Sequence, residues 1–319
     1  MIYAKDKKQE YVYSIYGLNI ASEIPMPELP AIDKKTMEGI DASVALGKAN
    51  GNIEDGVVIN EFLKVSGREF YLHIEGTARY YVADGSRIIV EPETWDDMDE
   101  LKTFLLGSCL GMLMYQRDIV AMHGSGVMVD GQGIIITGHT GAGKSTLTSA
   151  LRKEGCKFLA DDISALTMDD DGSILMHPAC PQAKLCRDAM VRMGYNPDEY
   201  KKTDNYRNKY IVPLKKHFLG SPVPLDGIFE LKTGDGDRTE VREVKGIEKI
   251  RLVLRNIYRI EIIRYLGLKP SYFQKCLVLA GRVPMYSITR PKSCFTVDEQ
   301  ARLIRSTLAG LKGSRSKNV

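Results

Sequence analysis

The sequence predicts a two-domain α/β protein, in which a small strand-rich domain precedes a domain built on a mixed sheet. The chain has 319 residues, which is long enough for two hydrophobic cores. In its first part, short β-like runs alternate with turn signals. Near the middle, an apolar run leads into a glycine-rich loop and then into a helical pattern. Strand, loop, helix and strand in this order are typical of α/β units.

The expected domain boundaries follow the changes in pattern. Residues 1–94 contain runs such as YVYSIYGLNI, EFYLHIEG and SRIIVEP, and we expect them to form the N-terminal domain. Residues 95–118 begin with acidic side chains and continue with apolar ones at helical spacing, which predicts a buried connecting helix. Residues 119–312 are expected to form the second domain, and residues 313–319 a disordered tail.

The second domain is expected to open with a hairpin. The run VAMHGSGVMV is separated from GIIITG by Asp130-Gly131, a dipeptide that favours tight turns. A helix from about Lys144 to Glu154 should follow the glycine-rich loop. The run CKFLADDISAL then predicts one strand, and ILMH a shorter one.

Composition narrows the classes of partner. Lys and Arg total 44 and Asp and Glu total 41, so the net charge of +3 predicts neither a nucleic-acid nor a membrane partner. The longest apolar run, FLLGSCLGMLMY, is too short to span a bilayer, and the charged start predicts a cytoplasmic protein. No CxxC pair occurs, so we interpret the cysteines as reduced, mostly buried thiols. These are Cys109, Cys156, Cys180, Cys186, Cys276 and Cys294.

The glycine-rich loop matches the phosphate-binding pattern G-x-x-x-x-G-K-[ST]. Its glycines let backbone N–H groups turn inward around phosphates, and the following helix adds its positive N-terminal end. We expect Lys144 to reach the β and γ phosphates of ATP and Ser145 to supply a hydroxyl to Mg²⁺. The expected nucleotide-binding residues are Gly138, His139, Thr140, Gly141, Ala142, Gly143, Lys144, Ser145 and Thr146.

Two consecutive carboxylates, Asp161 and Asp162, follow the apolar run KFLA. Neighbouring residues on a strand point to opposite sides, so the two should have different tasks. One carboxylate can bind the metal, while the other can take a proton from an attacking hydroxyl group. The alternative interpretation is a solvated strand end or a helix cap.

His123 lies on the first strand of the predicted hairpin. The turn at Asp130-Gly131 should place it near the level of the loop, within reach of Asp161. A histidine bonded to a carboxylate can orient it and tune its pKa. The alternative is a core histidine bonded to a backbone carbonyl.

Two basic segments could serve the transferred phosphate or its acceptor. Residues 201–217 are polar and could form a lid, with Arg207 and Lys209 as candidates for stabilising charge on the phosphoryl group. A solvated surface loop is the alternative. Arg251, Arg255 and Arg259 recur every fourth residue, which predicts a basic stripe on one amphipathic helix. The stripe could be a solvated face or could receive an acidic peptide or a second subunit.

The stretch HGSGVMVDGQGIIITGHTGAGKSTLTSALRKEGCKFLADDISAL resembles the catalytic core of HPr kinase/phosphorylase. It is more similar still to the related serine kinases found beside bacterial peptide-modification genes. The resemblance implies a P-loop kinase domain similar to the C-terminal domain of HPr kinase, with a core like that of phosphoenolpyruvate carboxykinase. It implies an ATP-dependent serine kinase in which Asp161 is the general base and His123 supports it. Asp162 and Ser145 would help to hold Mg²⁺, and Lys144 would act on the phosphates.

The chain also departs from HPr kinase/phosphorylase. After Asp162, the run MHPACPQAKLCRDAMVRMG differs from the arginine- and glycine-rich second signature of those enzymes. The start, SIYGLNIASEIPMPEL, resembles the related serine kinases instead. We therefore expect the acceptor to be a serine-containing peptide or protein other than HPr, with a homo-oligomer as a possible assembly.

Two other functions remain open at the level of sequence. A kinase acting on free serine or a similar small hydroxyl compound would need a small, closed acceptor pocket. A nucleotide-regulated binding module without phosphoryl transfer would need the loop but no base.

Overall fold

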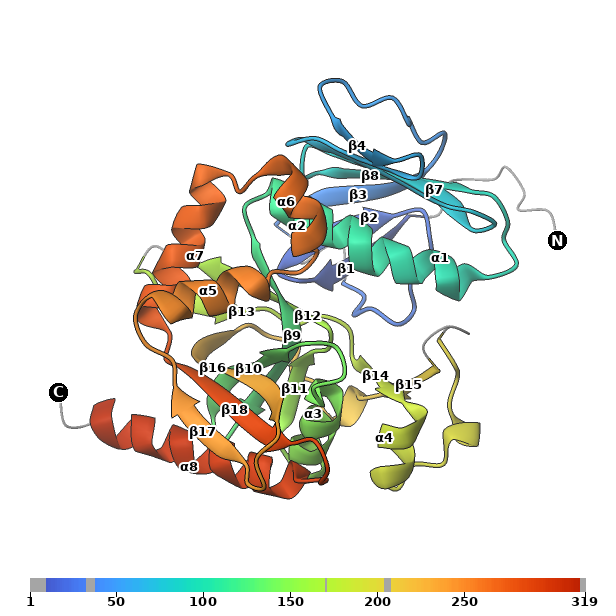
Figure 1. Cartoon of the computed structure of the whole chain (residues 1–319). Helices are drawn as coiled ribbons and strands as arrows, with labels where there is room; N and C mark the ends of the chain where they lie inside the picture. Colours follow the sequence, from blue (N-terminus) through green and yellow to red (C-terminus); the bar gives the residue numbers. More distant parts are fainter. Residues whose placement is uncertain (1–9, 33–37, 170, 204–207, 316–319) are drawn as a thin grey trace. The chain divides into compact units, whose positions relative to one another are not determined.

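The computed structural model describes residues 10–32, 38–169, 171–203 and 208–315 (Figure 1). The chain divides into two compact units. Unit 1 comprises Met1–Ile119 and Glu261–Lys269, and unit 2 comprises Val120–Ile260 and Pro270–Val319. The sequence interpretation had placed residues 261–269 in the second domain, but their contacts lie within unit 1.

Unit 1 contains one mixed sheet, in which some neighbouring strands are antiparallel and others are parallel. Its strands are β1 (Tyr11–Ile15), β2 (Leu18–Ser22), β3 (Ala42–Leu46), β4 (Val57–Asn60), β5 (Leu63–Val65), β6 (Glu69–Ile74), β7 (Ala78–Ala83) and β8 (Arg87–Pro92). They form an 8-stranded sheet in the order β1-β2-β3-β8-β7-β6-β5-β4. Most neighbours are antiparallel, whereas β3 runs parallel to both β2 and β8.

A helical segment covers one face of this sheet (Figure 1). It consists of α1 (Met98–Phe104), a π-helical turn η2 (Leu105–Cys109) and α2 (Leu110–Gln116). The segment begins at Met98 rather than at residue 95, because the Asp97 carboxylate accepts hydrogen bonds from the Asp99 and Glu100 amides and caps the helix. The Tyr80 hydroxyl on β7 donates to the Leu101 carbonyl at 2.9 Å and links the helix to the sheet. A further helix, α6 (Ile260–Leu266), returns to this unit.

Unit 2 contains a mixed sheet. Its strands are β9 (Val120–Val129), β10 (Gln132–Gly138), β11 (Lys157–Ala160), β12 (Ile163–Met168), β13 (Ile174–Met176), β16 (Val223–Gly234), β17 (Glu240–Glu243) and β18 (Met285–Pro291). The order is β10-β9-β12-β13-β16-β18-β17, and β11 pairs with β9. Because β10 also pairs with β16, five of these strands close into a ring. A separate pair joins β14 (Gln182–Cys186) to β15 (Lys209–Pro213).

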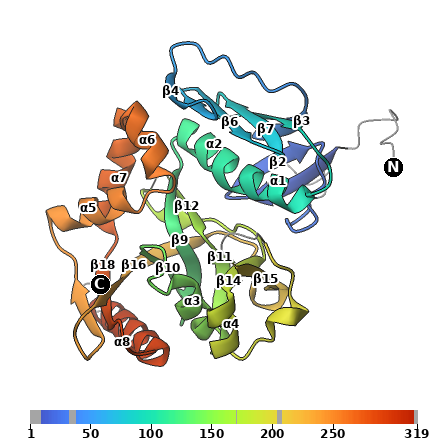
Figure 2. The ribbon, with the colours of Figure 1, turned by 45° about the vertical axis from the view of Figure 1, so that its right-hand side comes forward.

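The helices of unit 2 are α3 (Lys144–Lys153), α4 (Arg187–Arg192), α5 (Ile247–Arg255), α7 (Pro270–Arg282) and α8 (Val297–Arg315), with short 3-10 turns η3 (Pro197–Glu199) and η4 (Lys215–His217). Helices α3 and α8 lie side by side (Figure 2). Alternate residues of the sheet, such as Ile136, Phe229 and Ile288, form a buried core with apolar residues of α3 and α8, including Leu147 and Ile304. The N-terminus of α3 is thereby fixed against the end of β10.

Three expected elements differ from the structure. The run expected to form one strand after α3 is divided into β11 and β12, because Asp162 between them adopts a left-handed conformation with φ 52°. The expected helix carrying the three arginines is also divided, since α5 ends at Arg255 and α6 starts at Ile260. Helix α8 continues to Arg315, so part of the expected tail is helical, while residues 316–319 lie outside the described residues.

Two observations bear on what the sequence predicts about membrane-spanning helices and about the cysteines. Within the described ranges, no helix combines the length and the apolar character needed to cross a bilayer. The six cysteines form no disulfide among the described residues, and only Cys109, Cys156 and Cys276 are buried. Cys186 and Cys294 are exposed, contrary to the expectation of mostly buried thiols.

Candidate active site

The glycine-rich loop connects β10 directly to α3. Its glycines adopt backbone conformations that side chains rarely take, with φ of 133° at Gly138, 83° at Gly141 and 107° at Gly143. Gly138 is also needed for close packing, because a Cβ there would lie 2.4 Å from the Leu231 carbonyl oxygen of β16. Helix α3 begins at Lys144, so the first amide groups of the helix face the loop.

Lys144 closes the loop on itself. Its Nζ donates to the carbonyl oxygens of Gly138 at 2.7 Å and His139 at 3.1 Å. Burial lowers the pKa of Lys144, and the nearby charge of Lys209 lowers it further, whereas Asp162 and Asp161 raise it. An anionic ligand in the loop would therefore gain from a cation that is already partly desolvated.

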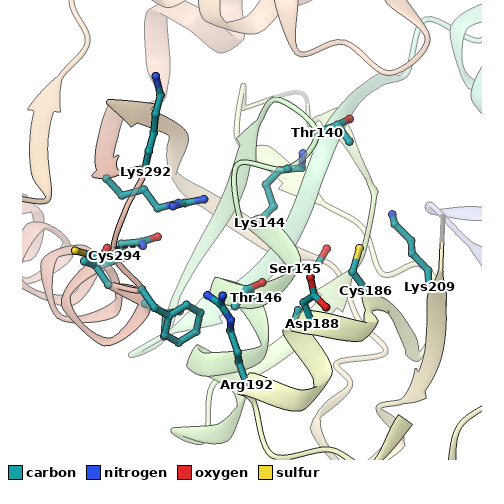
Figure 3. Close-up of a pocket in the computed structure, with 18 of the residues that line it drawn as sticks. Thr140, Lys144, Ser145, Thr146, Cys186, Asp188, Arg192, Lys209, Lys292 and Cys294 are labelled. Carbon is teal, nitrogen blue, oxygen red and sulfur yellow. Dashed lines mark hydrogen bonds between the residues drawn. The ribbon is translucent and has the colours of Figure 1, made fainter. Parts of the chain in front are cut away.

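A cavity of about 450 Å³ lies over the loop (Figure 3). Figure 3 shows Lys144 in its middle, with Lys209 to one side and Lys292 and Cys294 to the other. Its lining combines the loop with His123, Asp162 and segments far along the chain. Of the expected nucleotide-binding residues it includes Thr140, Gly141, Gly143, Lys144, Ser145 and Thr146. The side chain of His139 is exposed, and Gly138 and Ala142 shape the backbone of the loop.

Asp162 is the carboxylate that reaches this cavity. The His123 Nε2 lies 3.8 Å from its Oδ1, and both side chains are partly exposed. The sequence interpretation had paired His123 with Asp161 instead. The difference arises from the register: Ile163 lies opposite His123 and the Asp162 carbonyl accepts from the Gly124 amide at 3.0 Å, which places Asp162 next to the histidine.

Asp161 precedes the cavity residue Asp162 in the chain but does not itself line the cavity, and it is held by two donors. Its Oδ1 accepts from the Ser125 hydroxyl at 3.2 Å, and its Oδ2 accepts from the Lys184 amide of β14 at 2.8 Å. Burial raises the pKa of Asp161, and the neighbouring Asp162 charge raises it further, while these hydrogen bonds oppose the rise. The side chain is thus fixed in orientation and binds a proton more readily than an ordinary aspartate.

Several cavity residues have no signal in the sequence. Arg290 on β18 donates from Nε to the Ala142 carbonyl at 2.9 Å and so supports the loop from a distant segment. On the rim, the Arg192 guanidinium lies 5.2 Å from the ring centre of Phe295. Asp188 and Lys292 also line the cavity. Only the pairing of β18 with β16 and the position of α4 bring these residues to the loop, so no local spacing could have identified them.

The two basic segments have different positions. Lys209 on β15 lines the cavity, whereas Arg207 lies outside the described residues. Arg251, Arg255 and Arg259 do not form one stripe, because helix α5 ends at Arg255 and Arg259 lies beyond it. Arg251 pairs with Glu248 at 2.6 Å, and Arg255 makes paired contacts with the buried Glu230. Arg259 follows the end of α5 in a left-handed conformation.

The residues present fit a hard divalent cation beside a phosphate. Among the described residues there is no cluster of three or more His, Cys, Asp or Glu side chains that could hold a metal ion. Ser145 and Asp162, however, both line the cavity and offer a hydroxyl and a carboxylate oxygen. Mg²⁺ takes few protein oxygens and completes its coordination with phosphates and water, so this small set suits it.

Comparisons with known proteins give matches at the level of structure but none at the level of sequence. No protein-family model and no curated protein sequence matches the chain. Among solved structures, the HPr(Ser) kinase/phosphatase from Coxiella burnetii is matched with 14% sequence identity and a TM-score of 0.35. The match covers 62% of this chain and 96% of the other.

Proposed function

We propose that this chain is a Mg²⁺-ATP-dependent kinase that transfers the γ-phosphoryl group to a serine hydroxyl of a peptide or protein. The observation that carries the proposal is one cavity in which a left-handed glycine loop, Lys144, Ser145, Asp162 and His123 meet. A cavity of about 450 Å³ falls within the range typical of small-molecule sites. A purely structural loop would require neither a desolvated lysine nor a carboxylate and a histidine beside it.

The phosphates of the donor are expected to lie in the loop at the start of α3. Lys144 would move from the Gly138 and His139 carbonyls to the phosphate oxygens, which offer a full negative charge. Arg290 and Lys209 also line the cavity and add positive charge to it. Preorganised cations of this kind stabilise the charge that develops on the transferred group.

The two carboxylates are proposed to have different roles. Asp162 lines the cavity together with Ser145, so these two residues would hold Mg²⁺, which neutralises charge on the phosphates when it is bound. Asp161 would accept the proton of the serine hydroxyl, because its raised pKa and fixed orientation suit a general base. Unlike the sequence interpretation, this assignment places His123 beside Asp162, where it can orient that carboxylate.

The test is phosphoryl transfer from γ-labelled ATP with Mg²⁺, offered host cell extract in one reaction and free serine in another. Asp161→Asn should still bind ATP but lose transfer by at least about a hundredfold, because removing a general base costs roughly that factor. Asp162→Asn should instead lose the Mg²⁺ dependence of ATP binding. Lys144→Ala, as a control for the loop, should weaken ATP binding itself.

The outcomes separate the candidate functions. Label on a discrete peptide or protein that disappears with Asp161→Asn supports the proposal and identifies the acceptor. Label on free serine alone would indicate a small-molecule kinase. Full transfer by Asp161→Asn and none by Asp162→Asn would exchange the roles of the two carboxylates. If ATP binds but no acceptor is labelled in either reaction, the proposed kinase activity is contradicted in favour of a nucleotide-regulated binding module.

A further inference from the structure

A buried carboxylate lies in the central sheet, next to the strand that carries the glycine-rich loop. Glu230 on β16 has only 2% of its side chain exposed, and it pairs in register with Thr137, the residue before Gly138. A charged side chain in a sheet is costly unless it is fully partnered. The partners of Glu230 should therefore show what the charge contributes.

Glu230 binds the end of helix α5. Both carboxylate oxygens accept hydrogen bonds from Arg255, from Nε and Nη2, each at 2.6 Å. One oxygen also accepts from the Asn256 side chain at 3.0 Å, and Lys232 lies 3.0 Å from the other. Burial alone would raise the pKa of Glu230, but these donors outweigh it and lower the pKa to about 2. The glutamate is therefore ionised at neutral pH and binds Arg255 in a fixed, bidentate geometry.

The segment held in this way, residues 256–258, pairs with β9. The Asn256 carbonyl accepts from the His123 amide at 2.7 Å, and the Tyr258 amide donates to the Ala121 carbonyl at 2.8 Å. Met122 and Ile257 form a β-bridge between these two bonds. Along β9, β10 pairs only with residues 124–129, so residues 256–258 take the place of β10 where that strand leaves for the glycine-rich loop.

The segment also contacts the side chain of the cavity histidine, while β10 binds the carbonyl group of that residue. The rings of Tyr258 and His123 are stacked, with centres 6.1 Å apart. The Thr137 hydroxyl donates to the His123 carbonyl at 2.7 Å. His123 is thus held on both sides, by residues whose own positions depend on β16 and β10.

We infer that Glu230, Arg255 and Asn256 form a positioning unit that holds His123, and through it Asp162, in the geometry needed for phosphoryl transfer. This inference rests on the proposed kinase function. The three residues lie outside the cavity lining and touch no reacting group. Their effect is carried by the backbone of residues 256–258, which fixes the β9 segment at residues 121–123.

The experiment replaces each charged member of the unit. Glu230→Gln and Arg255→Gln should lower kcat about tenfold to a hundredfold, because small displacements of a reacting group have effects of that size. The KM for ATP should stay within about twofold, since the loop and Lys144 are unaltered. The double variant should be no worse than the more damaging single variant, because both break the same unit. Arg255→Lys keeps the charge and should retain intermediate activity. It takes the place of the glutamine variant if that variant folds poorly.

Arg305→Gln is the matched control. Arg305 on α8 also bridges carboxylates, Asp130 and Glu154, and its side chain is 28% exposed against 30% for Arg255. It lies outside the cavity, so kcat should stay unchanged in the control. Its carboxylate partners are 51% and 42% exposed, whereas Glu230 is 2% exposed, so Arg305→Gln should lose less stability than Arg255→Gln. An equal fall in kcat in the control would overturn the inference.

A second readout is independent of catalysis. Amide hydrogen exchange should accelerate at His123 and Tyr258 in the Glu230 and Arg255 variants, by about tenfold or more, but not in Arg305→Gln. Unchanged exchange, or a kcat within twofold of wild type, would contradict the positioning role. If the wild type shows no transfer at all, the proposed function fails, and the exchange measurement still decides whether the unit holds His123.

Discussion

At the scale of single residues, Phe295 is the side chain that we expect to meet the base of the proposed nucleotide. Its ring is 49% exposed although it is large and apolar, and it lies in the cavity lining against the Arg192 guanidinium. Aromatic rings and arginine planes can both stack on a nucleobase. Stacking is tolerant of base identity, because every base presents a similar face.

We therefore predict that Phe295→Ala raises the KM for ATP about tenfold with little change in kcat. The size follows from the roughly 1–3 kcal/mol that base stacking contributes, and the effect on GTP should be similar. Steady-state kinetics with each nucleotide would measure it. Phe273→Ala is the control, since Phe273 on α7 is 37% exposed and lies outside the cavity. An unchanged KM for both nucleotides would exclude Phe295 from the base site.

A second residue, His177, links stability to pH. It is 9% exposed, and its Nε2 shares a hydrogen bond with the Thr167 hydroxyl at 2.7 Å. Its buried Nδ1 has no hydrogen-bond partner among the described residues. Burial lowers the pKa of His177, and the charge of Asp169 only partly opposes this. In the folded chain the imidazole therefore stays neutral at a pH where the unfolded chain already binds a proton.

This shift predicts that the folded chain loses stability as the pH falls below about 6.5, the pKa expected in the unfolded chain. The stabilisation is fully present above that pH and decreases toward the lowered pKa of the folded state, at up to about 1.4 kcal/mol per pH unit. Urea unfolding at pH 7.5 and 5.5 should show a smaller loss for His177→Gln than for wild type. His217→Gln, at a partly exposed site, is the control, and identical pH dependence in all three proteins would refute the prediction.

At the scale of elements, the local chemistry of the sequence explains what could be predicted. The Asp130-Gly131 turn between β9 and β10 and the start of α3 at Lys144 follow from glycine positions and hydrophobic spacing alone. The strand after α3 was predicted as continuous, since its apolar pattern has no interruption that marks a break. The left-handed conformation of Asp162 ends that continuity, and aspartate adopts it more readily than most residues.

The break in the arginine-bearing helix has a tertiary cause. The spacing of apolar residues favours one helix, but the Asn256 side chain binds the Leu252 carbonyl and Glu230, and the backbone turns to pair with β9. This pairing is decided by the sheet, which no local pattern describes. The same reason explains why Arg290 and Phe295 were not among the expected site residues. Periodicity locates an element along the chain, whereas sheet register decides which distant residues share a cavity.

At the scale of the whole molecule, the path of the chain joins the two units more than once. It leaves unit 1 after Ile119, enters unit 2, returns for Glu261–Lys269 and enters unit 2 again. The returning segment is tied to the end of α2 within unit 1. The Tyr115 hydroxyl donates to the Gly267 carbonyl at 3.0 Å, and Lys269 Nζ donates to the Gln116 carbonyl at 3.1 Å. Unit 1 therefore depends on residues that follow most of unit 2 in sequence.

Lys269 should be a main contributor to this dependence. Its Nζ also lies 3.3 Å from the Tyr115 carbonyl and 3.4 Å from the Asp118 carboxylate, so one cation binds the carbonyl end of α2. We predict that Lys269→Ala lowers the free energy of unfolding of unit 1 by about 1–2 kcal/mol, since charged hydrogen bonds have that size. The single tryptophan, Trp95, lies in unit 1, so its fluorescence during urea unfolding reports this unit. Arg68→Ala, which removes the exposed pair with Asp84 within unit 1, should leave the urea midpoint of this unit nearly unchanged. If the two variants unfold at the same urea concentration, the returning segment contributes no more to unit 1 than a surface ion pair.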